Sequence, residues 1–546
     1  MLICVTLTIL VFNFCVGQQI INVNEYFEIS VLHFNDFHAR FEETDEEGNT
    51  CKNVSQCIGG YSRLYTQIQR SLNETPNALV LNAGDTFQGT LWYSVGKWNV
   101  SQEFMNKLPI DVEVLGNHDF DDGIAGVIPY ITSLRHPIVA CNIDDSLEPT
   151  IQGTYSKSKV IQRNGLKIGI IGVIISTCDQ ISSTGKLRFH LESPSVNEEA
   201  ERLVREEGVF TNIVLSHSGY EIDKQIAENA SKRISLIVGA HSHSFLYTGD
   251  NPPGVDTVSG DYPTTIKSKY GNKVLVVQAS AYSRYLGNIT LYLDEYGEVA
   301  DYSGAPIYLS SDILKDEAIN KELQPWKDIV DIQGLKVVGS TMTLLSRTGR
   351  YNYECTLGNF ITDAMIYSYT ENSAEGSWTE AALAMTNPGS LRANIGIGEI
   401  TYNDVVVSQP FENTFDIIEI EGKYLRELFE FTGMPSGEGD NRLNLLQLSG
   451  FHINYDLSLP IGQRVKSIKV RCQNCTVPVY EKLEEHKTYK VVVNSFMLMN
   501  NGEFTILTEN IKSKNIGRVD IDVILEYLSN RSPVFKEVET RMVFSN

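Results

Sequence analysis

The 546-residue sequence is poor in positive charge. It contains 45 lysine and arginine residues against 68 aspartate and glutamate residues, a formal net charge of −23. Phosphate backbones and anionic lipid surfaces repel such a chain, so we expect no nucleic-acid partner and no anionic membrane partner. Small anionic ligands are still allowed, because bound cations and local arginines dominate the electrostatic field inside a site.

The sequence also lacks a long apolar run. The apolar segment over residues 2–16 is too short and too close to the start to span a membrane, and we predict a signal peptide over residues 1–17. Because no basic residue lies near Met1, an N-terminal anchor is the alternative. Residues 539–546 have no apolar tail of the kind that a lipid-anchor signal requires. We therefore expect a secreted, extracellular chain with no stable membrane anchor.

Cysteine is scarce, with nine residues, of which two fall in the predicted signal peptide. Among the other seven cysteines, two pairs are close enough in sequence to close small loops, namely Cys51 with Cys57 and Cys472 with Cys475. The second pair could also be half of a zinc site or a redox pair, but no second pair or nearby histidine supports this, and a disulfide is favoured. The cysteines without an obvious mate are Cys141, Cys178 and Cys355.

Asn-x-Ser/Thr sequons are numerous enough to suit a secreted glycoprotein. The seven sequons begin at Asn53, Asn73, Asn99, Asn229, Asn288, Asn474 and Asn530. A chain of this length carries some sequons by chance, so they support secretion without deciding it.

The chain shows no internal repeat and no low-complexity segment, and it is too long for a single hydrophobic core. Residues 27–309 alternate short apolar runs with helical patterns, which predicts an α/β domain with a mainly parallel sheet. Residues 310–334 are charged and helical, and we expect a connecting helix that is broken or kinked at Pro325. Residues 335–546 mix strands and helices and form the predicted second domain.

Five apolar runs in the first domain each lead into side chains that can bind a metal. Open α/β sheets place their ligand sites at the carboxyl ends of strands, so these side chains are expected to meet there. In chain order they are Asp36, His38, Asp85, Asn117, His118, His217, His241 and His243. Each motif alone has an ordinary explanation as a capped turn or a satisfied loop histidine, but five coincidences in one domain favour a common site.

A two-metal site needs a bridging carboxylate and several neutral donors around two cations about 3.5–4 Å apart. Asp85 is alone on its loop and can bridge. Asp36 and His38 could serve one ion together with either His241 or His243, and the remaining histidine could join Asn117 and His217 at the second ion. Imidazole and carboxylate donors favour zinc and also fit manganese or iron, while calcium and magnesium are further candidates.

The same motifs resemble the metallophosphoesterase domain of the 5′-nucleotidase/apyrase family, and the resemblance extends from about Phe27 to the end of the chain. It is carried by the segments 34–38, 82–85, 116–121, 216–219 and 239–243. The resemblance implies a four-layer α/β/β/α catalytic domain, joined by a connecting helix to a mixed α/β substrate-binding domain.

The resemblance also implies roles for individual residues. One metal is expected to bind Asp36, His38, Asp85 and His243, and the other Asp85, Asn117, His217 and His241. His118 is implied to be the catalytic histidine, with Asp121 orienting it. This is chemically reasonable, because a metal-activated water can attack phosphorus while a histidine stabilises the phosphoryl oxygens or protonates the leaving group.

Three segments of the second domain resemble the substrate motifs of the family. They are residues 387–392, 409–415 and 491–496. Alone, a phenylalanine is more often a core residue and an arginine in a turn is usually solvated. The resemblance instead implies that Phe411 and Phe496 sandwich the base and that Asn387 and Arg392 hold phosphate. Stacking recognises a π-surface, and arginine matches phosphate oxygens.

Two departures from the family pattern concern the substrate. The ribose-binding aspartate that follows the second aromatic residue in the family is absent from residues 499–504, where Glu503 is the candidate substitute. Members of the family often hold a phosphate-binding arginine in a small disulfide loop before Glu-Cys, and here the loop before Glu354-Cys355 lacks its second cysteine. Arg350 lies close to the expected position of that arginine without matching it, and it is only a candidate for phosphate binding.

The resulting functional hypothesis is a secreted, metal-dependent nucleotide phosphohydrolase. An apyrase that converts ATP and ADP to AMP, and thereby removes the extracellular ADP that activates platelets, is preferred over a 5′-nucleotidase that converts AMP to adenosine. The missing anchor signal and the altered ribose segment favour the apyrase. A non-catalytic nucleotide binder and a cyclic phosphodiesterase or nucleotide-sugar hydrolase are the remaining candidates.

Overall fold

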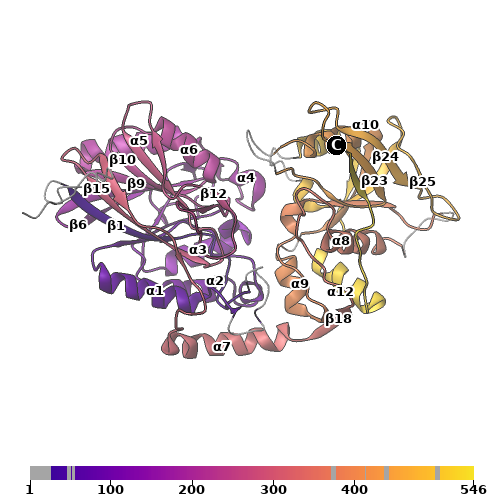
Figure 1. Ribbon diagram of the computed structural model, residues 1–546, viewed down its shortest axis with the longest axis horizontal. Coiled ribbons are helices and arrows are strands. Elements are labelled where there is room, and N and C mark those ends of the chain that lie inside the picture. Colours follow the sequence, from indigo (N-terminus) through magenta and orange to yellow (C-terminus); the bar gives the residue numbers. More distant parts are fainter. Residues whose placement is uncertain are drawn as a thin grey trace, which may run out of the picture.

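The computed structural model describes residues 26–45, 51, 56–370, 377–411, 413–435, 442–498 and 504–545. The predicted signal peptide, the Asn53 sequon and Glu503 lie outside the described residues. The chain forms two α/β domains that are joined by helix α7 (Glu317–Gly334), as Figure 1 shows. The predicted boundaries at residues 309 and 335 stay predictions.

The first domain contains two large sheets. The first sheet has the order β16-β15-β1-β2-β3-β4, and β17 also pairs with β15. Its strands are β1 (Phe27–Phe34), β2 (Leu79–Asn82), β3 (Val112–Val114), β4 (Ile138–Val139), β15 (Tyr285–Leu293), β16 (Val299–Ser303) and β17 (Ile307–Tyr308). Strands β1 to β4 are parallel, whereas β15 runs antiparallel to β1.

The second sheet has the order β13-β14-β10-β9-β7-β6. Its strands are β6 (Ser158–Arg163), β7 (Leu166–Ile174), β9 (Thr211–His217), β10 (Ile234–Val238), β13 (Thr264–Lys267) and β14 (Lys273–Val277). The four central strands are parallel and the two edge strands are antiparallel. Short pairs complete the domain: β5 (Ile143–Asp144) with β8 (Arg188–Phe189), and β11 (Phe245–Leu246) with β12 (Val258–Gly260).

The strands of the first sheet are apolar on both faces because helices cover one face and the second sheet covers the other. Along β1, Val31 packs between the two sheets, while Leu32 and Phe34 pack toward the helices. Helices α1 (Tyr61–Glu74), α2 (Leu91–Met105) and α3 (Gly123–Ser133) cover the first sheet, and α5 (Glu192–Arg202) and α6 (Tyr220–Asn229) cover the second. The expected four-layer α/β/β/α arrangement is confirmed (Figure 1).

The first domain also has short helical segments in its connections. They are a 3₁₀ turn at His118–Phe120, the short helix α4 (Cys178–Ile181) and a π-helical turn at Leu203–Glu207. The 3₁₀ turn follows β3 directly and lies at the carboxyl edge of the first sheet. The turn therefore positions His118 and Asp121, the two residues that were predicted to be catalytic.

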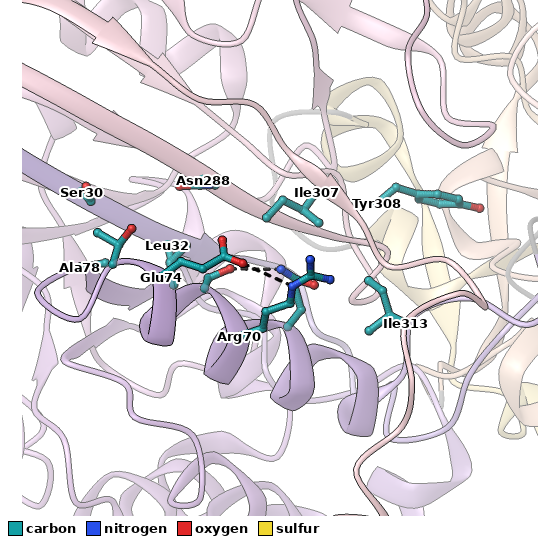
Figure 2. Close-up of a pocket in the computed structure, with 12 residues that line it drawn as sticks. Ser30, Leu32, Arg70, Glu74, Ala78, Asn288, Ile307, Tyr308 and Ile313 are labelled. Atoms are coloured by element: carbon teal, nitrogen blue, oxygen red, sulfur yellow. Dashed lines mark hydrogen bonds and ion pairs between the residues drawn. The ribbon is translucent and has the colours of Figure 1, made fainter.

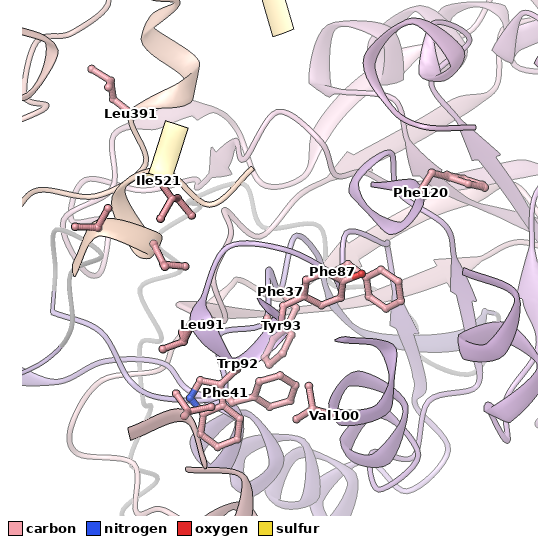
Figure 3. Packing of buried hydrophobic residues seen from close by; sticks show 14 of the residues in the cluster. Phe37, Phe41, Phe87, Leu91, Trp92, Tyr93, Val100, Phe120, Leu391 and Ile521 are labelled. Carbon is pink, nitrogen blue, oxygen red and sulfur yellow. The ribbon is translucent and has the colours of Figure 1, made fainter. Parts of the chain in front are cut away.

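A large apolar cluster underlies the carboxyl edge of the first sheet. Figure 3 shows aromatic residues of the first domain in this cluster, among them Phe37, Phe87 and Trp92. Leu391 and Ile521 of the second domain belong to the same cluster. Because one apolar cluster includes side chains from both domains, it stabilises the arrangement in which the two domains are in contact.

The connecting helix α7 is held against the first domain by polar contacts. Lys327 forms an ion pair with Glu42, and Trp326 Nε1 donates to Glu103 Oε2 over 2.9 Å. The helix runs through Pro325 without a break, so of the two predicted outcomes the break is wrong, and the kink stays a prediction. The contacts of α7 with the first domain stabilise the helix as a whole and offset the hydrogen bond that a proline cannot donate.

The second domain is built on a five-stranded sheet of order β22-β19-β26-β21-β27 and a four-stranded sheet of order β25-β24-β23-β28, with β18 paired to β20. The strands are β18 (Val337–Thr341), β19 (Leu383–Thr386), β20 (Gly398–Thr401), β21 (Phe415–Glu421), β22 (Gln447–Ser449), β23 (Phe451–Asp456), β24 (Val465–Arg471), β25 (Tyr480–Lys482), β26 (Thr488–Asn494), β27 (Ser513–Asn515) and β28 (Met542–Ser545). The helices are α8 (Thr356–Tyr367), α9 (Tyr402–Ser408), α10 (Gly422–Thr432), α11 (Thr505–Asn510) and α12 (Asp520–Arg531). Two further 3₁₀ turns, at Pro388–Ser390 and Ser495–Leu498, follow β19 and β26.

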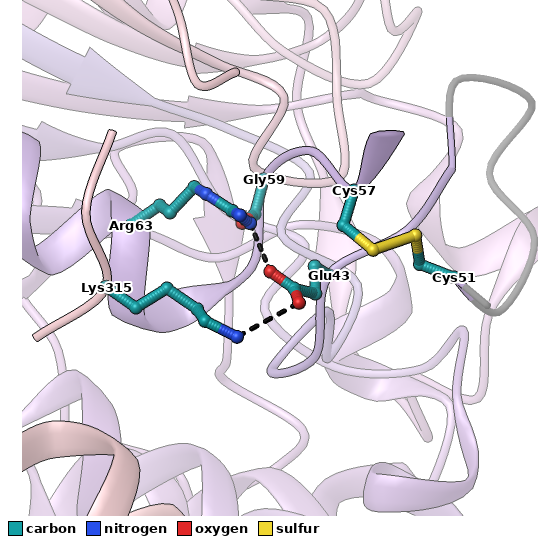
Figure 4. Close-up of a disulfide and its surroundings, with 6 residues drawn as sticks. All are labelled: Glu43, Cys51, Cys57, Gly59, Arg63 and Lys315. Carbon is teal, nitrogen blue, oxygen red and sulfur yellow. Dashed lines mark hydrogen bonds and ion pairs between the residues drawn. A yellow bond between two sulfur atoms is a disulfide. The ribbon is translucent and has the colours of Figure 1, made fainter. Parts of the chain in front are cut away.

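A disulfide lies next to the start of α1. Cys51 pairs with Cys57, and close to this disulfide Glu43 forms ion pairs with Arg63 and Lys315 (Figure 4). The ion pair between Glu43 and Lys315 links this part of the first domain to the residue just before α7. The disulfide ties Cys57, just before α1, to Cys51, and the ion pair ties Arg63 of α1 to Glu43.

The predicted second disulfide, Cys472 with Cys475, is also present, and Cys141, Cys178 and Cys355 are buried and free. No helix among the described residues has the length and apolar character that a membrane span requires.

Candidate active site

Five loops of the first domain meet at the carboxyl ends of β1, β2, β3, β9 and β10, as the sequence predicts. Several of the predicted metal ligands in these loops have a left-handed backbone, which is uncommon for residues other than glycine. Their φ angles range from 49° to 71° and belong to Asp36, His38, Asp85, His241 and His243. Such conformations cluster at functional sites, where the surrounding structure holds them in place.

The first group of candidate ligands consists of Asp36, His38 and His243, whose donor atoms lie within 4.8 Å of one another. His243 Nε2 is 3.2 Å from Asp36 Oδ1 and 3.2 Å from His38 Nε2. His38 Nε2 also lies 3.6 Å from Asp85 Oδ2. Asp85 therefore contacts this first group, and it is also a member of the second group of candidate ligands.

The second group consists of Asp85, His217 and His241. His217 Nε2 is 3.1 Å from Asp85 Oδ2, and Asn117 Oδ1 is 2.7 Å from His241 Nδ1. Asn117 therefore adds an amide oxygen to this group, and all seven predicted metal ligands lie in one cluster. These are candidate ligands for a dinuclear divalent metal site, and carboxylate, amide and imidazole donors fit such a site.

The orientation of the histidine rings also fits a metal site. His38 Nδ1 donates to the backbone oxygen of Phe87 over 3.2 Å, and His217 Nδ1 donates to that of Ala83 over 2.7 Å. These contacts turn both Nε2 atoms toward the carboxylates, as is usual for metal-binding histidines. The buried His217 Nε2 makes no hydrogen bond.

The charge of the site favours a cation beside His217. Burial lowers the pKa of His217, but the charge of Asp85, a side-chain interaction with this carboxylate and the charge of Asp36 raise it to about 10. A potential that stabilises a proton on this ring also stabilises a metal cation at the same place.

Asp119 is a buried residue whose function sequence analysis missed. Its carboxylate accepts hydrogen bonds from the backbone N–H groups of Gly116, Asp85, Thr86 and Phe87 over 2.8–3.2 Å. Asp119 thereby ties the loop after β2 to the loop after β3. Gly116 allows the two loops to approach closely, because a Cβ atom there would lie 2.1 Å from Asp85 Oδ1.

His118 and Asp121 form a hydrogen-bonded pair beside the ligand cluster. His118 Nδ1 donates to Asp121 Oδ2 over 2.7 Å, and the backbone N–H of His118 donates to Asp85 Oδ1 over 2.8 Å. Burial lowers the pKa of His118, but Asp121 and Asp85 raise it to about 9. Asp121 thus fixes the ring orientation and favours its protonated form.

A cavity of about 470 Å³ lies between the two domains and connects this pair to the predicted substrate residues. His118, Asp121 and His241 line it from the first domain. From the second domain the predicted residues that line it are Asn387, Arg392, Phe411 and Phe496. This volume lies in the usual range for small-molecule sites.

Two aromatic and cationic contacts join the domains in this cavity. The ring of Phe411 stacks on His118 with a centroid distance of 5.1 Å, and the guanidinium of Arg392 lies 5.0 Å from the centre of the Phe411 ring. The buried Oδ1 of Asn387 has no hydrogen-bond partner. The predicted substrate residues therefore face the metal-ligand cluster across one cavity.

Arg350 lies behind the substrate loop and is not among the residues that line this cavity. Its Nε donates to the backbone oxygen of Pro388 over 2.9 Å, and its guanidinium lies over the ring of Tyr351, which does line the cavity. This position supports the turn that contains Asn387. Direct phosphate binding by Arg350 stays a prediction.

A second feature that sequence analysis missed is a group of arginines around Tyr282, which we call the Tyr282 cluster (Tyr282, Arg40, Arg284, Arg347 and Arg392). The Tyr282 ring lies 4.6 Å from the Arg40 guanidinium and 5.9 Å from that of Arg284. Burial raises the pKa of Tyr282, but Arg392, His243, Arg40 and Arg347 lower it to about 6. Arg392 belongs to the predicted substrate motif 387–392, but no sequence motif marks the other members, and only the folded structure brings them together.

The Tyr282 cluster borders the first group of candidate ligands. The Tyr282 ring is 5.6 Å from the ring of His38 and 5.2 Å from that of His243.

A different hollow, of about 400 Å³, lies between α1 and the first sheet and shares no lining residue with the cavity between the domains (Figure 2).

Comparison with known proteins gives two family matches. Residues 29–245 match the calcineurin-like phosphoesterase family, and residues 337–509 match the 5′-nucleotidase C-terminal domain family. Each match lies within one of the two structural domains. They cover both the ligand cluster and the substrate motifs.

Full-length relatives match over nearly the whole chain. The apyrase of Tabanus yao is 46% identical over 509 residues, which covers 93% of this chain and 92% of that protein. The 5′-nucleotidase of Rattus norvegicus is 36% identical over 528 residues, which covers 95% of this chain and 91% of that protein.

The fold also matches a solved structure. The 5′-nucleotidase precursor from Thermus thermophilus superposes with a TM-score of 0.83 at 29% identity, over 95% of this chain and 100% of that one. Sequence, fold and site agree: the chain belongs to the 5′-nucleotidase/apyrase family and is a hydrolase that acts on nucleotide phosphates.

Proposed function

We propose that the chain is a secreted, divalent-metal-dependent apyrase that converts ATP and ADP to AMP and phosphate. The observation that carries this proposal is the 46% identity to the apyrase of Tabanus yao over 93% of the chain. Removal of extracellular ADP, which activates platelets, would then be its physiological role. A 5′-nucleotidase activity on AMP is the second candidate, and the 36% identity to the 5′-nucleotidase of Rattus norvegicus supports it.

The two groups of candidate ligands divide into two metal sites in this proposal. Asp36, His38 and His243 hold one cation, and Asn117, His217 and His241 hold the other, while Asp85 contacts both. Zinc is the preferred metal, and manganese, magnesium and calcium are the alternatives. Bound divalent cations stabilise charge on the phosphoryl oxygens and lower the pKa of the attacking water.

The proposed task of His118 follows from the pair that it forms with Asp121. Because Asp121 accepts the hydrogen bond from His118 Nδ1, the other ring nitrogen of His118 is left for the substrate. A protonated ring at this place donates to a phosphoryl oxygen or to the oxygen of the leaving group. His118 also lines the cavity between the domains.

The second domain holds the nucleotide in this proposal. Phe411 and Phe496 contact the base, while Asn387 and Arg392 contact the phosphates. All four side chains line the same cavity as His118, and this shared lining supports a position of the phosphates close to the ligand cluster. An arginine fork matches phosphate oxygens, and stacked aromatic rings accept different bases.

Replacing Phe496 with alanine is expected to weaken nucleotide binding specifically. Stacking of a base on an aromatic ring contributes about 1–3 kcal/mol, so KM for ADP should rise by about 5- to 150-fold with a small change in kcat. Phe496→Tyr keeps the ring and should retain most of the affinity. Steady-state kinetics with p-nitrophenyl phosphate, which has no base, should give nearly the same kcat/KM for all three proteins. An equal loss with both substrates would show that Phe496 does not bind the base.

The substrate proposal is tested by phosphate release from ATP, ADP and AMP by the purified, metal-supplemented protein. An apyrase releases phosphate from ATP and ADP and leaves AMP as the nucleotide product. Release from AMP alone would contradict the apyrase proposal and establish the 5′-nucleotidase. Secretion and glycosylation are checked separately, by N-terminal sequencing and by glycosidase treatment of the protein from the culture medium.

A further inference from the structure

Strand β3 contains a buried carboxylate on the side of the first sheet that faces the helices. Val112 and Val114 pack between the two sheets, so the alternation of side chains along the strand turns Glu113 toward the helices. Glu113 is fully buried, although the side chains of β1 and β2 on this side include the apolar Leu32 and Val80. Because an apolar residue would avoid the cost of burying a carboxylate, Glu113 needs an explanation other than packing.

Three buried side chains contact the carboxylate of Glu113. Its Oε1 accepts hydrogen bonds from the hydroxyl of Tyr130 over 2.7 Å and from Thr86 Oγ1 over 3.3 Å. Its Oε2 lies 2.8 Å from His136 Nε2. Tyr130 and Thr86 are fully buried and His136 is nearly so. A buried carboxylate with several hydrogen bonds is held in one position, so Glu113 forms a fixed acceptor beneath the loops of the site.

One of these donors belongs to the loop that carries Asp85. Thr86 follows Asp85 directly, and its hydroxyl accepts a hydrogen bond from Asn82 Nδ2 over 3.1 Å while it donates to Glu113. The backbone N–H of Thr86 donates to Asp119 Oδ1 over 3.0 Å, so two different carboxylates hold the backbone and the side chain of this residue. Asp85 has a left-handed φ of 55°, a conformation that persists only where the surrounding structure holds it.

We propose that Glu113 is a positioning residue for the metal site, which acts through the Thr86 hydroxyl to hold the carboxylate of Asp85 between the two groups of candidate ligands. This inference rests on the proposed function, since it concerns the two cations of that reaction. Hydrogen-bonded partners behind metal ligands orient those ligands, and their loss typically lowers metal affinity by about 10- to 100-fold. His136 pairs with Glu113 and compensates its charge when the ring is protonated.

The test is the binding of zinc to the metal-free protein, measured by competition with a chromogenic chelator. Glu113→Gln keeps the size of the side chain but replaces one acceptor oxygen with an amide donor, and it should raise the Kd for zinc by about 10- to 100-fold. Thr86→Val removes the hydroxyl that links Glu113 to the Asp85 loop and should raise the Kd by a similar factor. Thr86→Ser keeps the hydroxyl and should bind zinc nearly as well as the wild type.

The matched control is Glu199→Gln, the same substitution at another buried carboxylate of the first domain. Glu199 lies on α5, is 3% exposed and accepts hydrogen bonds from Arg202 and Ser158, which lie outside the loops of the candidate ligands. This control should bind zinc like the wild type. A loss of zinc affinity as large as that of Glu113→Gln would overturn the proposal, because it would show a general effect of removing a buried carboxylate.

A double-mutant cycle separates positioning from a general loss of stability. If Glu113 acts through Thr86, the double variant Glu113→Gln/Thr86→Val should lose little more zinc affinity than either single variant, and fully additive losses would overturn the proposed route. A lower melting temperature of both metal-free single variants, together with an unchanged Kd for zinc, would show a structural role only and would also overturn it.

The two threonine variants decide the question if Glu113→Gln does not fold. Equal zinc affinities of Thr86→Val and Thr86→Ser would then overturn the proposal, whereas a weaker affinity of Thr86→Val alone would support it. Failure of the wild type to hydrolyse any nucleotide would instead contradict the proposed function. The two failures are distinguishable, because zinc binding is measured without turnover.

Discussion

His118→Ala is expected to lower kcat for nucleotide hydrolysis by about a hundred- to ten-thousandfold, the usual contribution of a positioned acid or base. The His118 ring lines the cavity, and Asp121 holds its Nδ1 over 2.7 Å. The variant loses the group that donates a proton to the reacting phosphate. Its folding and metal content should not change, because His118 is not one of the proposed ligands.

The measurement combines steady-state kinetics with metal analysis by mass spectrometry and with circular dichroism. Asp121→Asn is the companion variant, since it keeps the size of the side chain but removes the charge that orients the ring. It should lose less activity than His118→Ala. If His118→Ala retained the rate of the wild type, or lost its metals together with its activity, the proposed role of His118 would be wrong.

Asp85→Ala is expected to have a still larger effect, because it should abolish the binding of both metal ions. Asp85 Oδ2 lies 3.1 Å from His217 Nε2 in one group of ligands and 3.6 Å from His38 Nε2 in the other. Its Oδ1 also accepts the backbone N–H of His118 over 2.8 Å. Removal of this carboxylate leaves each group with fewer donors and a less negative potential, so hydrolysis should fall below detection.

The matched control for this variant is Asp223→Asn. Asp223 is also a fully buried aspartate close to the site, and its carboxylate accepts a hydrogen bond from Ser216 over 2.6 Å. Burial raises the pKa of Asp223 to about 8, so the neutral asparagine resembles its protonated form. This control should keep two metals per chain after dialysis. Two retained metals in Asp85→Ala would refute the bridging role.

The parts of the site that follow strands could be predicted from the sequence. A parallel strand ends at a known edge of its sheet, so the order of apolar runs and polar loops was enough to assign Asp36, Asp85, Asn117, His217 and His241 to one place. The apolar runs before them form buried strands, as predicted. The sheets are more mixed than expected, because β15, β6 and β13 run antiparallel to their neighbours.

The parts of the site that depend on tertiary packing could not be predicted. Asp119 lies within a recognised motif, but its task depends on backbone N–H groups of another loop. Apart from Arg392, which lies in a substrate motif, the members of the Tyr282 cluster have no local sequence pattern. Arg350 is a candidate for phosphate binding, and the hydrogen bond of its Nε to the backbone oxygen of Pro388 could not be predicted, because hydrogen bonds of a long side chain depend on the folded environment.

The central claim is that seven side chains from five strand ends converge on two divalent cations. A crystal structure of the zinc-loaded protein, with anomalous diffraction data collected on both sides of the zinc absorption edge, tests this claim directly. Two zinc peaks are expected, one against Asp36, His38 and His243 and the other against Asn117, His217 and His241, with Asp85 contacting both. A single peak, or zinc bound away from these side chains, would contradict it.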